Sequence, residues 1–265
     1  MKNTGNNSYL VSVIMNCHNG EKYLKHSLRS VLKQSYKNWE LIFYDNLSTD
    51  KSKSIVQKKI KIDKRIKYFK SKQFLNLYEA RNRAIDKSKG NYICFLDTDD
   101  FWDKNKLKVQ IDYIKKFKCE ILYSKFFILN EIKKKKYLNE KKKLSSGFLT
   151  QDFLNNYSLG ILTVILKKSV FSKIIFNKRY NIIGDFDFFI KASILYKIHA
   201  INKPLATYRH HAENLSNKKI DLNLKEFLYW QKKNRSKLKK FKLNNLKWKI
   251  FKLELKKFIK NFIIK

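Results

Sequence analysis

Cysteine is rare in this sequence of 265 residues, which contains only Cys17, Cys94 and Cys119. Three cysteines without a CxxC spacing argue against a disulfide framework and a zinc site, and they favour a reducing compartment. No apolar run approaches the roughly 18 to 20 residues of a membrane span, and the first residues lack the apolar segment of a signal peptide. We therefore expect a cytoplasmic protein.

Glycine and proline are also scarce, with six glycines and one proline, Pro204. The glycine-rich fingerprints GxGxxG and GxxxxGK[ST] do not occur, so the sequence carries no sign of a dinucleotide-binding fold or a P-loop. No glycine follows Gly184 and no proline follows Pro204. Because both residue types interrupt helices, this scarcity predicts a helical segment over residues 221–265, broken near Ser236.

Acidic residues are outnumbered, with 22 Asp and Glu against 60 Lys and Arg, which gives a net charge of +38. Such a charge is compatible with a nucleic-acid or anionic-membrane partner. Only seven of the basic residues are arginine, however, and nucleic-acid readers favour the bidentate arginine fork. A lysine-rich composition of the kind produced by an AT-rich genome explains most of the charge, and we expect no specific nucleic-acid partner.

Short apolar runs rich in β-formers alternate with amphipathic helical patterns over the first 120 residues. The predicted strands are 10–16, 39–45, 65–69, 91–96 and 120–129, and the predicted helices are 21–34, 50–60, 77–88 and 106–117. This alternation predicts an α/β fold with a mostly parallel sheet flanked by helices. The second half is less regular, with a charged loop or hairpin over 130–147, a predicted strand over Ile161–Leu166 and a predicted helix over Asp185–Leu195.

Polar clusters follow three of the predicted strands: NCHNG from Asn16, DNLSTD from Asp45 and DTDD from Asp97. Ligands of parallel sheets lie beyond the carboxyl ends of the strands, so we expect the three clusters to line one crevice. Carboxylate oxygens suit Mg²⁺ or Mn²⁺, which proteins bind through one or two carboxylates plus substrate phosphates. The alternative for DTDD is a helix N-cap that satisfies free backbone N–H groups.

These residues carry a family resemblance. VSVIMNCHNGEKYLKHSLRSVLKQSYKNWELIFYDNLSTDKS, followed by EARNRAIDKSKGNYICFLDTDDFW, resembles a family 2 glycosyltransferase with the GT-A fold over residues 10 to about 120. Weaker matches continue to Ser216 through IIGDFDFFIKAS and YRHHAENLS. The resemblance implies a Rossmann-like sheet and the transfer of a sugar from a nucleotide diphosphate donor with inversion, usually with a divalent metal, Mn²⁺ or Mg²⁺.

The resemblance assigns the metal and diphosphate region to four residues. Asp97 and Asp99 match the family's DxD motif, in which Asp99 would bind the metal and Asp97 the ribose or a metal-bound water. His211 matches a histidine that completes the metal shell in some relatives, and its alternative is a lone surface histidine. Arg81 matches an ARN sequence near the diphosphate, and its alternative is a solvated helix face.

The remaining nucleotide contacts follow the first two strands. His18 stands where the family often has an aromatic residue that stacks on the base, and Asn16 lies in the same segment. Asp45 and Asn46 match the usual acidic pair that contacts the base, although Asn46 replaces the second acid. The motif therefore leaves the identity of the nucleobase open, and the expected donor is a UDP-sugar.

Asp185 matches the family's catalytic base in the stretch IIGDFDFFIK, where Gly184 replaces a common glutamate. Inversion by direct displacement needs one general base to deprotonate the attacking hydroxyl, unlike the carboxylate pair of a hydrolase. The alternative is that Asp185 only caps the helix that it opens. The expected acceptor is a glycan or a lipid-linked hydroxyl, in surface polysaccharide or lipopolysaccharide synthesis.

We predict a catalytic domain over residues 1–216, with a nucleotide-sugar half to about residue 120 and an acceptor half from 121, and a basic helical tail over 217–265. In this tail Trp248, Phe251, Leu255, Phe258, Ile259 and Phe262 fall on one helical stripe among lysines. Such helices lie on anionic membranes, so a peripheral position on the inner face of the cell membrane is one expectation. The other is that the stripe packs on the catalytic domain or on a second subunit.

Two rival functions remain. One is a relative that binds a nucleotide sugar without transferring it, and the intact Asp97, Asp99 and Asp185 argue against it. The other is a nucleic-acid-binding protein, which is suggested by charge alone.

Overall fold

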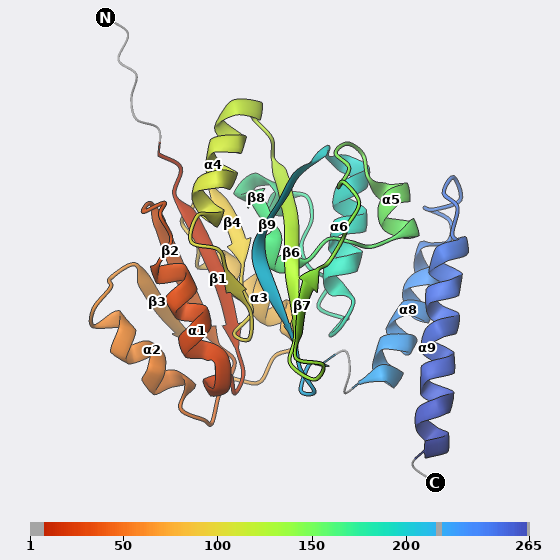
Figure 1. Cartoon of the computed structure of the whole chain (residues 1–265), viewed down its shortest axis with the longest axis horizontal. Helices are drawn as coiled ribbons and strands as arrows, with labels where there is room; N and C mark the ends of the chain where they lie inside the picture. The colour runs from red at the N-terminus through yellow and green to blue at the C-terminus, as the bar shows by residue number, and fades with distance from the viewer. Residues whose placement is uncertain (1–7, 216–218, 264–265) are drawn as a thin grey trace, which may run out of the picture.

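The chain folds around one large β-sheet with helices on both faces (Figure 1). This computed structural model describes residues 8–215 and 219–263. Within these residues nine strands form the sheet in the order β3-β2-β1-β4-β8-β6-β9-β5, and β7 pairs with β6 off this path. The predicted α/β fold with a mixed, mostly parallel sheet and C-terminal helices is confirmed.

The first part of the chain follows the predicted alternation. Its elements are β1 (Val11–Cys17), α1 (Glu21–Leu32), β2 (Trp39–Asp45), α2 (Ser52–Ile60), β3 (Ile66–Lys70), α3 (Leu77–Asp86) and β4 (Tyr92–Phe95). Strand β1 pairs in parallel with β2 and β4, and β2 pairs in parallel with β3. The carboxyl ends of these strands therefore meet at one edge of the sheet. Every residue of β1 and β2 is buried, as is typical of strands covered on both faces.

The second half adds both parallel and antiparallel strands. Its elements are β5 (Phe101–Trp102), α4 (Lys106–Phe117), β6 (Ile121–Asn130), β7 (Lys135–Leu138), α5 (Thr150–Asn155), η1 (Ile161–Thr163), β8 (Ile165–Lys167), η2 (Lys168–Ser172), α6 (Gly184–Leu195) and β9 (Ile198–His210). Strand β8 runs antiparallel between β4 and β6, and β9 runs parallel to β6. The charged segment after β6 forms the hairpin with β7.

The predicted strand over Ile161–Leu166 is only partly correct, because residues 161–163 form the short 3-10 helix η1 and the strand begins at Ile165. The Thr163 hydroxyl donates to the Gly160 carbonyl at 2.7 Å, and the Thr163 carbonyl accepts from Gln110 at 2.7 Å. These bonds stabilise the turn and take the Thr163 carbonyl out of the ladder.

Two apolar clusters fill the two sides of the sheet. On one side Val13 and Met15 of β1 pack with residues of α1, α2 and α4. On the other side Ile14 of β1 packs with α3, α5 and α6. The alternation of β1 side chains between the two clusters follows from the period of two in a strand.

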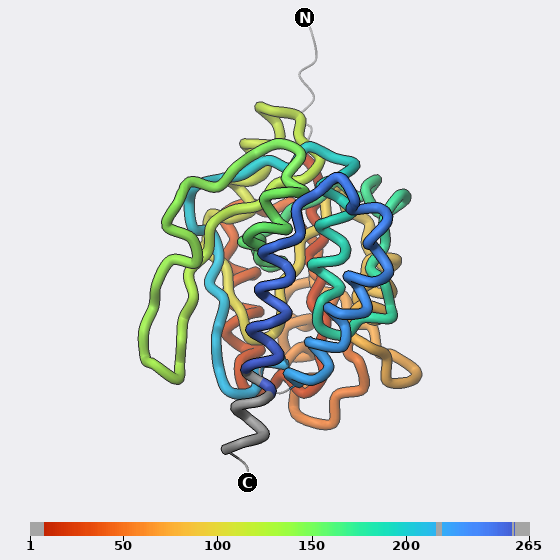
Figure 2. The backbone as a smooth tube through the Cα atoms, turned by 90° about the vertical axis from the view of Figure 1, so that its right-hand side faces the viewer, coloured from red at the N-terminus to blue at the C-terminus, as the bar shows by residue number. Residues whose placement is uncertain are grey.

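Helices α8 (Ile220–Asn234) and α9 (Asn244–Ile263) run antiparallel along the outside of the second cluster, at the right in Figure 1 and in front in Figure 2. The break between them agrees with the interruption predicted near Ser236. Leu224, Phe227 and Trp230 of α8 are buried in the same cluster as α6. The predicted boundary at Ser216 lies outside the described residues. Over 8–215 and 219–263, no helix has the length and apolar character that a membrane crossing requires.

Candidate active site

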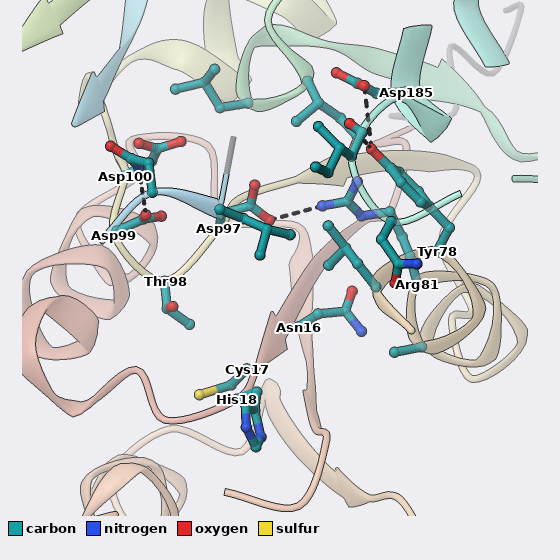
Figure 3. A pocket seen from close by; sticks show the side chains of 18 of the residues that line it. Asn16, Cys17, His18, Tyr78, Arg81, Asp97, Thr98, Asp99, Asp100 and Asp185 are labelled. Carbon is teal, nitrogen blue, oxygen red and sulfur yellow. Dashed lines mark hydrogen bonds and ion pairs between the residues drawn. The ribbon is translucent and has the colours of Figure 1, made fainter. Parts of the chain in front are cut away.

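Seven of the nine predicted site residues line a cavity of about 660 Å³ at the carboxyl edge of the parallel strands, whereas Asp45 and His211 lie outside its lining. Its lining includes Asn16, His18, Asn46, Arg81, Asp97, Asp99 and Asp185. In Figure 3, Asp97 lies between the Asp99–Asp100 pair and the Arg81 side chain, and Asp185 lies beyond Arg81. The expectation that three strand ends line one crevice is thus met.

Asp97 is paired with a buried cation. Its Oδ1 lies 2.9 Å from Nη2 of Arg81, whose side chain is only 2% exposed. The Arg81 guanidinium sits 5.4 to 5.6 Å from the ring centres of Tyr78, Phe95 and Phe176. Arg81 is therefore not part of a solvated helix face. Burial still raises the pKa of Asp97, and the nearby carboxylates of Asp99 and Asp185 act in the same direction.

Asp99 meets His211, which arrives from the end of β9. Nε2 of His211 lies 3.0 Å from Oδ2 of Asp99, and His211 is buried rather than a surface histidine. The backbone N–H of Glu213 donates to Nδ1 of His211 at 3.2 Å. Nδ1 accepts this hydrogen bond, and Nε2 faces the Asp99 carboxylate. A cation bound between Nε2 and Oδ2 would gain both a nitrogen and an oxygen ligand.

The loop that carries Asp99 and Asp100 is fixed by Arg209 of β9. Its backbone N–H donates to the Asp100 carboxylate and its Nε donates to the Asp99 carbonyl, each at 2.8 Å. Nη1 of Arg209 donates to Glu131 at 2.6 Å, and the Tyr23 hydroxyl donates to the same carboxylate. Burial and the neighbouring Asp99 raise the pKa of Asp100 well above its usual range. The loop therefore brings several carboxyl groups close together, an arrangement that a cation would stabilise.

These residues supply part of a metal-binding site. Over 8–215 and 219–263, no three His, Cys, Asp or Glu side chains converge as a complete ligand cluster, because Asp97 is engaged by Arg81 while Asp99 and His211 face each other. Mg²⁺ and Mn²⁺ need only one or two carboxylates when substrate phosphates supply the other oxygens. Asp99 and His211 are thus the residues that would hold it, and Asp97 as a direct ligand stays a prediction.

The cavity wall that follows β1 and β2 is built by His18 and Asn46. The Asn46 amide forms two hydrogen bonds to the Leu75 backbone, to its carbonyl at 2.7 Å and from its N–H at 2.9 Å. Nδ1 of His18 lies 2.9 Å from the Asn46 carbonyl, so this nitrogen donates. The His18 ring also contacts Phe74, with ring centres 4.8 Å apart. Asn46 thus fixes the cavity wall, and His18 presents its ring beside Phe74.

Asn16 offers an unused amide to this cavity. Its Oδ1 and Nδ2 are buried, and neither has a hydrogen-bond partner in the described part of the chain. An unsatisfied buried polar group costs about 1 to 3 kcal/mol. A ligand with a neighbouring donor and acceptor would remove that cost.

Asp45 lies beside the cavity rather than in its lining. Its carboxylate is fully buried and accepts from the Ser48 N–H at 2.8 Å and from the Tyr68 hydroxyl at 2.5 Å. The structure therefore shows it fixing the turn after β2. A direct contact between Asp45 and a base stays a prediction.

Asp185 opens α6 on the opposite wall from Asp99. Its Oδ1 accepts from the Phe186 N–H at 2.8 Å and lies 3.3 Å from the Tyr78 hydroxyl (Figure 3). Burial raises the pKa of Asp185, although the Phe186 N–H and the Arg81 charge oppose this. A Cβ on Gly184 would lie 2.4 Å from the Tyr78 ring. Tyr78 therefore fills the space that a larger residue at position 184 would need.

The segment that presents Asp185 is held by α8. Glu226 accepts hydrogen bonds from three consecutive backbone N–H groups, those of Asn181, Ile182 and Ile183, at 2.7 to 3.1 Å. Trp230, one turn further along α8, donates from its indole to Asp187 at 2.9 Å. The tail thus fixes the start of α6 from outside the cavity.

We expect Glu226→Gln to lower kcat by roughly tenfold or more, because small displacements of a reacting group are costly, while donor affinity stays close to that of the unchanged protein. The amide would leave an N–H donor facing backbone N–H groups. Turnover and donor binding should be measured below the melting temperature. The control is Glu254→Gln on α9, where the side chain is exposed. Unchanged kcat in Glu226→Gln would contradict a positioning role.

Sequence patterns gave no sign of several supporting residues, namely Tyr78, Glu131, Arg209, Asn214 and Glu226. Asn214 donates to the Arg209 carbonyl at 3.2 Å, and its Oδ1 accepts from the His211 N–H at 2.6 Å. All these residues act through partners that lie far away in the sequence or on loops. The YRHHAENLS match covers Arg209 and Asn214 but assigned a role only to His211.

Solved structures with this architecture contain nucleotide sugars. The crystal structure of S. aureus TarS 1–349 in complex with UDP-GlcNAc has a TM-score of 0.65 at 20% identity, over 82% of this chain and 65% of that chain. The mannosyltransferase PcManGT from Pyrobaculum calidifontis, in complex with GDP-Man and Mn²⁺, has a TM-score of 0.63 at 14% identity, over 85% and 64% of the two chains. The fold is therefore that of the GT-A transferases.

Comparison of the sequence with known proteins identifies the family. It belongs to glycosyl transferase family 2, whose model matches residues 12–189. The chain is 35% identical over 162 residues to the UDP-Glc:alpha-D-GlcNAc-diphosphoundecaprenol beta-1,3-glucosyltransferase WfgD of Escherichia coli, over 61% of this chain and 62% of that protein. It is 29% identical to the amylovoran biosynthesis glycosyltransferase AmsB of Erwinia amylovora, over 83% of this chain and 75% of that protein. The match covers 62% of the length of WfgD and of another curated relative.

Proposed function

We propose that this glycosyltransferase moves a sugar, with inversion, from a UDP-sugar to a hydroxyl of a glycan or a lipid-linked acceptor in surface polysaccharide or lipopolysaccharide synthesis. The observation that carries the proposal is the placement of Asp185 and of the Asp97–Asp100 loop around one cavity. The relative WfgD, by its name, uses UDP-Glc and a diphosphoundecaprenol-linked acceptor. An acceptor of that kind would place the reaction at the cytoplasmic face of the membrane.

The donor would bind with its base against His18 and its diphosphate towards Asp99. The imidazole of His18 can stack on a base, and the unpaired amide of Asn16 can both donate to and accept from a uracil or ribose group. Arg81 would act by holding Asp97 towards the ribose. A bound Mn²⁺ or Mg²⁺, held by Asp99 and His211, would supply Lewis-acid stabilisation of the departing diphosphate.

The acceptor hydroxyl would approach from the Asp185 side. Asp185 takes the hydroxyl proton as the oxygen attacks the anomeric carbon, and the raised pKa brings its proton affinity closer to that needed near neutral pH. The attack comes from the face opposite the leaving diphosphate, so the configuration inverts. Because Asp185 and Asp99 lie on opposite walls, one carboxylate serves the attacking oxygen and the other serves the leaving group.

The test is a calorimetric screen of UDP-sugars, GDP-mannose and the free nucleotides, with Mn²⁺, with Mg²⁺ and with EDTA. We expect UDP-sugars to bind in a metal-dependent way and to be turned over when a lipid-diphosphate-linked sugar is added. Metal-dependent binding without transfer to any acceptor would favour the non-catalytic relative. Binding of RNA or DNA at physiological salt together with no nucleotide-sugar binding would overturn the proposal.

A further inference from the structure

Helix α9 has two apolar faces, and only one of them is used for packing. Leu246 and Ile250 are buried in the core cluster, and Leu253 packs against it. Trp248, Phe251 and Leu255 fall on the other side and are 56%, 50% and 48% exposed. The spacings of three and four in each set put them on separate faces of one helix. We call the second set the outer stripe.

The outer stripe therefore does not hold the tail to the catalytic domain, since Leu246, Ile250 and Leu253 do so. Figures 1 and 2 agree that α9 lies on the outside of the molecule, with α8 beside it and α6 on the inner side of this helix pair. The rings of Trp248 and Phe251 stack with centres 5.3 Å apart, which forms a continuous apolar surface. In the sequence Phe258, Ile259 and Phe262 extend the same spacing, but their side chains lie outside the described residues.

Exposed lysines flank the outer stripe on both sides. Lys252 lies next to it with Nζ 5.3 Å from the Trp248 ring centre, and Lys247 lies on its other side. Residues 218–265 contain 17 Lys and Arg and three acids, Asp221, Glu226 and Glu254. Glu226 is buried against backbone N–H groups, so the exposed surface of the tail is strongly cationic. An exposed apolar stripe bordered by lysines matches the interface of an anionic membrane.

We propose that the outer stripe and its flanking lysines are a docking surface for an anionic lipid bilayer, with α9 parallel to the membrane plane. A second copy of this chain fits less well, because two surfaces that are both dense in lysine would repel each other. The bilayer instead offers negative headgroups to the lysines and an apolar layer to Trp248 and Phe251.

The mode of docking leaves the catalytic site intact. The core-facing side of α9 and the Glu226 contacts to the α6 segment remain as they are when the outer stripe enters lipid. The active-site cavity and the membrane are then connected by a rigid helix pair rather than by a flexible tether. Removal of the whole tail would instead delete Leu224, Phe227 and Trp230 and uncover Phe186, which packs on two of them, so a test by truncation would confuse docking with unfolding.

The test uses the full chain and vesicle sedimentation. Wild type is expected to bind vesicles of phosphatidylcholine with phosphatidylglycerol, to bind those of phosphatidylcholine alone weakly, and to be released by salt. The variant Trp248→Ser, Phe251→Ser, Leu255→Ser should partition at least about tenfold less. The control replaces Ile62, Phe117 and Ile132 by Ser, since these side chains are as exposed on other surfaces and should not matter.

Two results would overturn the docking surface. One is equal sedimentation of wild type and the outer-stripe variant, or sedimentation of neither. The other is a dimer of wild type in ultracentrifugation that the outer-stripe variant converts to a monomer, because a second copy would then cover the stripe. Vesicle binding does not depend on sugar transfer, so this outcome is separate from that of the donor screen.

Discussion

Replacing Asp185 by Asn is expected to lower kcat by roughly 10²-fold or more, the usual scale for loss of a general base. The amide oxygen can still accept from the Phe186 N–H, which Asp185 Oδ1 does at 2.8 Å, so the start of α6 should keep its shape. Only the ability to take a proton is lost. Donor affinity, measured by calorimetry, should change little, because Asp185 lies on the wall where we propose that the acceptor binds.

The control is Asp152→Asn in the first turn of α5, where the carboxylate is also near a helix start but exposed. It should have the turnover of the unchanged protein. If Asp185→Asn instead loses donor binding and keeps its turnover with saturating donor, Asp185 is a binding residue and not the base.

The pH profile gives the same assignment a second readout. Asp185 accepts a proton only when ionised, so kcat should fall as the pH drops through its pKa. Since burial raises this pKa, the acidic limb of kcat should lie above the ordinary aspartate value of about 3.9. A profile that stays flat down to that value would separate Asp185 from the proton transfer.

The strand ends in the first 120 residues could be predicted from the sequence because each step of that prediction is local. A buried parallel strand gives a continuous apolar run, and the polar residue that follows must sit at the carboxyl edge. Asn16, Asn46 and Asp97 reach the cavity for this reason. Asp45 does not line the cavity, because its carboxylate accepts a hydrogen bond from Tyr68 on the neighbouring strand β3. No local pattern predicts that pairing.

The second half of the chain was harder to predict, because its arrangement depends on contacts between segments that are distant in the sequence. Strand β9 carries Arg209 and leads to His211, but Pro204 and register shifts beside Ser124 and Lys125 disturb its alternating pattern. From the sequence alone, the glycine at position 184 is a departure from the family pattern. The structure shows that the Tyr78 ring lies against this glycine. The tail spacing placed Trp248, Phe251 and Leu255 on one helical face, as the structure does, yet periodicity cannot tell a packed face from an exposed one. Only the structure shows that Ile250 lies on the buried face of α9 and Trp248 on the exposed face.

The largest loss of activity is expected from Asp99→Ala, which should reduce transfer by at least roughly 10³-fold, since a Lewis-acidic metal contributes several kcal/mol to departure of the diphosphate. Asp99 is a cleaner probe than Asp97. Removing Asp97 would strand the Arg81 cation, which is only 2% exposed, and an unpaired buried charge costs stability. Asp99 is 27% exposed on a loop held by its backbone carbonyl, so its carboxylate can be removed without unfolding.

The metal itself supplies the discriminating measurement. Mn²⁺ together with UDP should raise the melting temperature of wild type, and this shift should disappear in Asp99→Ala while the melting temperature without ligands stays nearly the same. His211→Ala should weaken the shift less, because the carboxylate remains. The control is Asp112→Ala on α4, whose carboxylate is 58% exposed and pairs only with Lys108 among the ion pairs of the described residues. Full wild-type activity in EDTA, or an undiminished Mn²⁺ shift in Asp99→Ala, would exclude Asp99 as the residue through which a cation acts on the leaving diphosphate.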